Sequence, residues 1–230
     1  MIMEALRAVL GAPPVPQGSW EREALFASTA ALRATAEPPA EAAERLAARL
    51  RAVPGVRRVD VRPNGFLVIG VAVPGEIVDD VLALPLTVSA PARGAAAPWP
   101  DFPRTWDNPG FAVRYAYVRA GAVRRWAREL GVSVDAVARL ELLDGPFDRA
   151  VLRVLAELPS RRDSRDPGWA AYLERLAEVY HTAVERASPI PRGDEPPSEV
   201  HAARVRMGDA VRRVLGEGLA ELGVAPPGKI

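Results

Sequence analysis

Two side chains near the middle of the sequence have the types and the spacing that suit an unstacked nucleobase. Tyr115 and Arg119 are four residues apart in a segment with helical periodicity, so they are expected to face the same way. An aromatic ring can stack on such a base while a guanidinium bonds its edge or a neighbouring phosphate. The alternative is that Tyr115 belongs to the core and Arg119 pairs with an acid.

Further arginines make this part of the sequence locally basic. Arg114, Arg125 and Arg128 occupy a second face of the same segment, where phosphate contact and an ordinary solvated face are the two interpretations. Residues 104–139 hold seven arginines against three acidic residues, a local charge of +4. Residues 204–215 hold four against one, a local charge of +3. Because the whole chain carries only +1, we expect the positive charge to gather in these two segments.

The sequence offers little for catalysis or metal binding. It has no cysteine and two histidines, which excludes disulfides and cysteine-ligated metal sites. His181, with Glu178 and Glu185 nearby, could serve as a general base. A histidine flanked by acids at helical spacing is, however, more typical of a surface cluster. Asp79 and Asp80 are adjacent, so their carboxylates should diverge. We therefore assign no catalytic residue, no metal and no cofactor.

The second half of the chain has the pattern of an all-α bundle. Asn108 is placed to cap a helix whose first residue is Pro109, and Gly131 is expected to end it. An apolar stripe at steps of three and four predicts its buried face: Phe111, Tyr115, Val118, Ala122 and Trp126. Further helices are expected at 145–158, 169–185 and 198–222, within a helical domain spanning 107–230.

The first half is expected to be a small module of helices and strands covering residues 1–88. Residues 3–10 and 19–35 are rich in alanine and leucine, and residues 38–52 show clearer helical periodicity. Residues 56–61 and 66–73 have the pattern of two strands around a turn. A proline-rich linker with two tryptophans, residues 89–106, follows. The predicted fold class is α+β, with this N-terminal module joined to the all-α bundle.

Several segments resemble one known family in the correct order. The run from Asp107 to Arg119, the pairs Tyr172-Leu173 and Leu176-Ala177, and the run from Val211 to Gly223 resemble the DALR-type anticodon-binding domain of arginyl-tRNA synthetases. Residues 63–67 resemble a turn in the additional N-terminal domain that helps hold the tRNA elbow. The organisation is similar to actinobacterial anticodon-binding proteins that lack the synthetase core.

The resemblance implies tRNA as the partner, of arginine type, and a synthetase as a candidate protein partner. The RNA-binding residues it implies are Asn108, Arg114, Tyr115, Tyr117, Arg119 and Arg212. The chain departs from the family near the pocket expected to read the middle anticodon base. Arg114 and Tyr117 replace glutamine and histidine, and smaller or altered residues stand at Ala112, Val184 and Ile230. Altered or weakened recognition of the anticodon is therefore a second outcome.

The sequence lacks the motifs of an aminoacylation core. We find no His-x-Gly-His element, no Lys-Met-Ser-Lys-like loop and no glycine-rich phosphate loop, so we expect a protein that is not an enzyme. No apolar stretch approaches about 18 residues and no leader pattern is seen, so a cytoplasmic location without membrane contact is expected. The leading hypothesis is a non-catalytic tRNA-binding protein. The alternative is a protein-interaction or regulatory module that keeps the fold without binding RNA.

Overall fold

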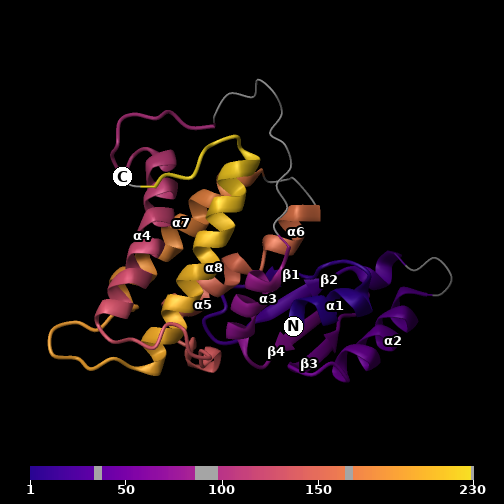
Figure 1. The fold of residues 1–230 in the computed structure, drawn as a ribbon. Coiled ribbons are helices and arrows are strands. Elements are labelled where there is room, and N and C mark those ends of the chain that lie inside the picture. Colours follow the sequence, from indigo (N-terminus) through magenta and orange to yellow (C-terminus); the bar gives the residue numbers. More distant parts are fainter. Residues whose placement is uncertain (34–37, 86–97, 164–167, 229–230) are drawn as a thin grey trace.

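The fold combines a small antiparallel sheet with a helical bundle, as the predicted α+β class requires (Figure 1). The computed structural model describes residues 1–33, 38–85, 98–163 and 168–228. The sheet and its helices come from the first half of the chain. The bundle comes from the second half and stands beside the sheet in Figure 1.

The sheet contains four antiparallel strands in the order β1-β2-β4-β3. Their bounds are β1 Val15–Gln17, β2 Leu25–Ser28, β3 Val56–Val61 and β4 Leu67–Val71. The strand pair predicted at 56–61 and 66–73 is confirmed, with Val59 opposite Ile69. Gly65 has a φ of 79° in the turn between these strands, a conformation that favours glycine. Strand β4 is central and buried at every position.

The helical expectation for residues 19–35 is wrong. The described part of this range contains strand β2 and a 3-10 turn, Ala30–Arg33, and residues 34–35 lie outside the described ranges. Pairing of β2 with β1 and β4 outweighs the local preference of alanine and leucine for helix, because it places Phe26 in the core. The rings of Phe26 and Trp20 meet edge to face there, with their centroids 5.2 Å apart. The other helices of the module are α1 Ile2–Leu10, α2 Pro39–Arg51 and α3 Ile77–Ala83. Helices α1 and α2 confirm the expectations for 3–10 and 38–52.

The bundle contains the helices predicted from residue 108 onward. They are α4 Pro109–Glu129, α5 Pro146–Leu155, α7 Trp169–Arg186 and α8 Glu199–Glu221. A further helix, α6 Leu158–Asp163, has no counterpart in the prediction. The Asn108 side chain accepts a hydrogen bond from the Gly110 N–H, which confirms the predicted cap. The helix expected over 145–158 instead ends at Leu155, and α6 begins three residues later.

Helix α4 turns a different face inward from the one predicted. Its buried side is a row of mostly small residues: Val113, Ala116, Ala120, Val123 and Ala127. In the predicted stripe, Ala122 is buried, but Phe111, Tyr115 and Val118 are only half-buried and Trp126 is 48% exposed. The small side chains let α4 approach α8 and α7 closely, and this turns its bulkier residues outward.

Arginines of the bundle hold the N-terminal module through main-chain carbonyls. Arg149 donates to Trp20 O at 3.2 Å, Arg153 to Gly18 O at 2.5 Å, Arg162 to Pro85 O at 3.1 Å and Arg213 to Leu84 O. A continuous hydrophobic core includes residues of both parts. The division at 88 and 106 stays a prediction, and residues 86–97 lie outside the described ranges.

The N-terminal module and the chain ahead of α5 approach closely at Gly75. A Cβ atom on this residue would lie 2.0 Å from the Leu140 carbonyl oxygen. We therefore expect Gly75→Ala to lower the free energy of unfolding by about 1–3 kcal/mol, because the two parts must move apart. Denaturant unfolding followed by circular dichroism measures this change. Gly168→Ala is the matched control, since no atom lies within 4 Å of its added Cβ, and an equal loss in both variants would contradict the prediction.

Candidate nucleic-acid interface

Four rings gather where α4 and α7 meet the loop that precedes α4. Trp106, Phe111, Tyr115 and His181 form this aromatic cluster. Tyr115 stacks between Phe111 and His181, with ring centroids 5.8 Å and 5.6 Å away. Trp106 meets the other three rings edge to face at 5.1–5.7 Å and is 59% exposed. The cluster therefore ends in an indole that is open to solvent.

His181 is fixed in one neutral tautomer by its two partners. Its Nδ1 lies 3.2 Å from Nη1 of Arg119, and its Nε2 lies 3.0 Å from the Ala112 carbonyl oxygen. A guanidinium can only donate, so Nδ1 accepts and the hydrogen on Nε2 is donated to the carbonyl. Burial lowers the pKa of His181, and the charge of Arg119 lowers it further. The expectation of a surface cluster is wrong, because the ring is only 9% exposed.

Arg119 also pairs with an acid, as the alternative interpretation of the sequence proposed. Its Nη1 lies 3.6 Å from Oε1 of Glu185, and 20% of its side chain is exposed. Tyr115 is half-buried and lies within the aromatic cluster. The two residues do share one face of α4, which confirms their predicted geometry. Contact of either residue with RNA stays a prediction.

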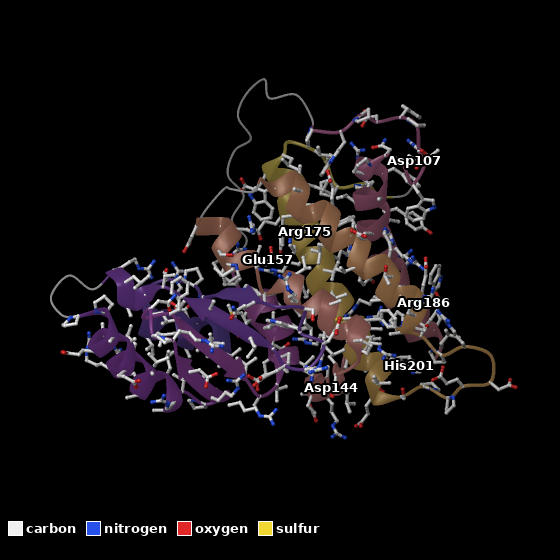
Figure 2. All side chains as sticks on the ribbon, turned by 180° about the vertical axis from the view of Figure 1, so that it is seen from behind. Asp107, Asp144, Glu157, Arg175, Arg186 and His201 are labelled. Carbon is white, nitrogen blue, oxygen red and sulfur yellow. The ribbon has the colours of Figure 1, made fainter. Side chains whose placement is uncertain are left out.

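Asn108 holds the loop that carries Trp106. Its amide nitrogen donates to the carbonyl oxygens of Pro100 at 3.0 Å and Pro103 at 2.9 Å, while its oxygen caps α4. The residue is 4% exposed and both amide hydrogens have acceptors within the protein. Any contribution of Asn108 to RNA binding would therefore be indirect, through the position of Trp106. Figure 2 shows Asp107, which follows Trp106, at the end of the bundle away from the α/β module.

The other residues implied by the resemblance lie apart from the aromatic cluster. Arg114 pairs with Asp101 at 2.9 Å. Arg212 lies over the ring of Tyr117, with its Cζ 4.7 Å from the ring centroid, on the side of α4 that faces α8. The six predicted RNA-binding residues thus fall into three groups rather than one surface.

A pocket of about 390 Å³ adjoins the aromatic cluster. It is lined by Trp106, Pro109, Ala112, Glu174, Glu178, His181, Thr182 and Glu185. Ala112 lines this pocket with a small side chain. Val184 is buried, and Ile230 lies outside the described residues. The carboxylates of the three glutamates give the pocket several hydrogen-bond acceptors.

The basic segments of the sequence do not form an open basic patch. Five of the seven arginines between residues 104 and 139 pair with a carboxylate: Arg114, Arg119, Arg124, Arg128 and Arg139. In the second segment, Arg204 binds the buried Asp148 through two hydrogen bonds of 3.0 and 3.2 Å. Arg206 pairs with Asp79 at 2.7 Å. Acids distant in the sequence thus neutralise much of the local charge.

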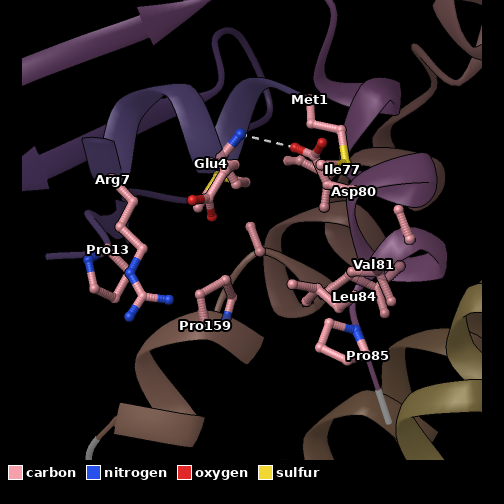
Figure 3. A pocket seen from close by; sticks show the side chains of 14 residues that line it. Met1, Glu4, Arg7, Pro13, Ile77, Asp80, Val81, Leu84, Pro85 and Pro159 are labelled. Atoms are coloured by element: carbon pink, nitrogen blue, oxygen red, sulfur yellow. Dashed lines mark hydrogen bonds between the residues drawn. The ribbon is translucent and has the colours of Figure 1, made fainter. Parts of the chain in front are cut away.

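A second pocket, of about 260 Å³, separates α1 and α3 from the turn between α5 and α6 (Figure 3). Its walls are mostly apolar, with residues such as Ile77, Val81, Leu84 and Pro159. At its edge, Oδ2 of Asp80 accepts a hydrogen bond of 2.8 Å from the Met3 N–H at the start of α1 (Figure 3). Burial raises the pKa of Asp80. We assign Asp80 a structural role, because its carboxylate caps α1.

Trp106 and His181 of the aromatic cluster are not among the predicted RNA-binding residues, and the sequence gives only weak signals for them. Trp106 lies in the predicted linker, and its position two residues before the Asn108 cap is the one local signal for it. His181 is placed by α7, and no pattern within α7 reveals its contacts with α4. Among the described residues, His, Asp and Glu side chains do not gather in threes as a metal site needs, and no helix is long and apolar enough to span a membrane.

Part of the chain is similar to curated proteins. An arginine–tRNA ligase of Clavibacter sepedonicus is 41% identical over 129 residues, which cover 54% of this chain and 23% of the ligase. The chain contains a synthetase-related domain. It spans about a quarter of the length of that curated relative. No family model matches the chain, and no solved structure matches it.

The neutral state of His181 predicts a loss of stability in acid. The ring titrates near 6.5 in the unfolded chain and at lower pH in the folded protein, so only the unfolded state gains the proton as the pH falls through 6.5. We expect the contribution of His181 to the free energy of unfolding to decrease from pH 7 to pH 5. Replacing the ring in His181→Gln should remove part of this slope in denaturant titrations. His201→Gln is the companion variant, because burial also lowers the pKa of His201. Parallel profiles for wild type and His181→Gln would contradict the prediction.

Proposed function

We propose that this chain is a non-catalytic tRNA-binding protein and that the aromatic cluster receives an unstacked base of the anticodon stem-loop. The observation that carries the proposal is the exposed indole of Trp106 beside a pocket of about 390 Å³. The relation of part of the chain to an arginine–tRNA ligase supports tRNA as the nucleic acid. Arginine-type tRNA is the first candidate.

The chemistry of the pocket favours recognition of a base over recognition of a phosphate. A base can stack on the Trp106 indole, since every base has a π-face. The carboxylates of Glu174, Glu178 and Glu185 accept hydrogen bonds from exocyclic amino groups, such as N4 of cytosine. Glu174 already accepts a hydrogen bond of 2.6 Å from the Trp99 indole N–H, and Glu185 pairs with Arg119 at 3.6 Å, so Glu178 is the first candidate among the three to read a base.

Trp106→Ala tests the stacking role. The variant should weaken tRNA binding by about 1–3 kcal/mol, the usual contribution of one stacked base, and should fold normally because the indole is 59% exposed. Filter binding or fluorescence anisotropy with purified tRNAs at two salt concentrations measures the affinity. Trp126→Ala, at the other end of α4 and 48% exposed, is the matched control. Equal affinities for both variants would contradict the stacking role.

Arg119→Ala tests the second predicted contact. If its guanidinium touches a base or a loop phosphate, binding should weaken by about 1–3 kcal/mol while Arg125→Ala, on another face, stays near wild type. Glu185→Gln removes the acid partner and keeps Arg119. A purely structural role predicts a larger loss of stability for Arg119→Ala than for Glu185→Gln, because Arg119→Ala also removes the donor to Nδ1 of His181, and it predicts no effect of Arg119→Ala on binding beyond that loss. Thermal unfolding of both variants distinguishes the two roles.

The same pocket supports a second candidate, a protein-interaction module. Its three glutamates repel phosphates and would attract a basic segment of another protein, such as a synthetase. Purification of partners from the host before and after nuclease treatment separates the candidates, because an RNA-bridged partner is lost and a direct one is retained. Absence of tRNA binding above that of an unrelated protein would remove the first candidate.

A further inference from the structure

A buried carboxylate at the junction of the bundle and the N-terminal module holds three arginines. Glu157, in the turn between α5 and α6, is 5% exposed. Arg175 of α7 binds it through two hydrogen bonds, of 3.3 Å to Oε1 and 2.6 Å to Oε2. Arg153 of α5 lies 3.1 Å from Oε1, and Arg161 of α6 lies 3.5 Å from Oε2. Each guanidinium reaches this single acid from a different helix.

A second ion pair adjoins this group of side chains. The next residue of α6, Arg162, binds the buried Glu217 of α8 through two hydrogen bonds, of 2.7 and 2.5 Å. We call Arg153, Arg161, Arg162, Arg175, Glu157 and Glu217 the arginine cluster. Guanidinium groups stay protonated in proteins, so the six side chains of the arginine cluster comprise four cations and two carboxylates.

We infer that the arginine cluster is a binding site for phosphate groups of a nucleic-acid backbone. Planar guanidinium forks match the oxygens of a phosphate, and Glu157 holds three of them in place before binding. Arg175 is the most accessible of the three, with 43% of its side chain exposed. An arginine fixed by a buried acid loses little side-chain entropy when it meets a ligand, which favours affinity.

The position of the cluster suits a nucleic acid that also reaches the aromatic cluster. Arg175 and His181 are six residues apart on α7, about 9 Å along the helix axis and about 120° apart around it, so a ligand that contacts both must curve around α7. Glu157 and Arg175 lie close together where the bundle meets the α/β module (Figure 2), and Arg153 also donates to Gly18 O of that module. The backbone of a bound nucleic acid would therefore pass the place where the bundle meets the α/β module. The inference rests on the proposed tRNA binding and adds a contact that the resemblance does not assign.

Arg175→Gln tests the inference with the full chain. The variant leaves Arg153 and Arg161 on Glu157, so the acid keeps partners and the fold should persist. We expect tRNA affinity to fall about 3- to 30-fold and the slope of log K against log salt to decrease in magnitude by about one, as loss of one phosphate contact requires. Arg186→Gln, at the exposed last residue of α7, is the matched control and should stay within about twofold of wild type.

Three outcomes would overturn the inference. The first is unchanged affinity and salt slope in a folded Arg175→Gln protein when wild type binds tRNA. The second is an increase of melting temperature with inorganic phosphate, at constant ionic strength, that is abolished by Arg175→Gln, because it would identify a free phosphate compound as the ligand. The third is a wild-type protein that does not bind tRNA, which would also contradict the proposed function. If Arg175→Gln does not fold, Arg175→Lys keeps the charge, and it should keep the wild-type salt slope while lowering affinity.

Discussion

The close approach of α4 to α8 is the constraint on which the rest of the bundle surface depends. Ala116 and Ala120 are fully or almost fully buried between the helices, and a larger side chain at either position would separate them. Since the small residues occupy the inside, Phe111 and Tyr115 turn toward α7 and the preceding loop. The aromatic cluster therefore follows from the packing of α4, and the exposed indole follows from the Asn108 cap that shapes the loop.

The secondary structure was largely predictable because its signals are local. The cap at Asn108, the proline at the first helical position and the alternation in 56–61 each act within a few residues. The face of α4 was not predictable from hydrophobicity alone, because alanine counts little in such a pattern although it allows the closest helix contacts. Strand β2 was missed for a related reason, since its partner β4 lies about 40 residues further along the sequence.

The candidate site was less predictable than the fold because its chemistry depends on partners from distant segments. Arg119 and Tyr115 share a face as expected, yet the tautomer of His181 is set by Ala112, about 70 residues away. The local charge of residues 204–215 was misleading for the same reason, as Asp148 and Asp79 neutralise two of its arginines. Sequence charge locates cations, whereas only the fold shows which of them have a carboxylate partner.

The carbonyl contacts between the bundle and the N-terminal module have a consequence for sequence change. Arg162 and Arg213 donate to main-chain oxygens of Pro85 and Leu84, so the acceptors are independent of the side chains at those positions. Substitutions there can alter the surface of the module while leaving its attachment in place. The orientation of the module can thus persist through drift in its own sequence, provided that the arginines of the bundle remain.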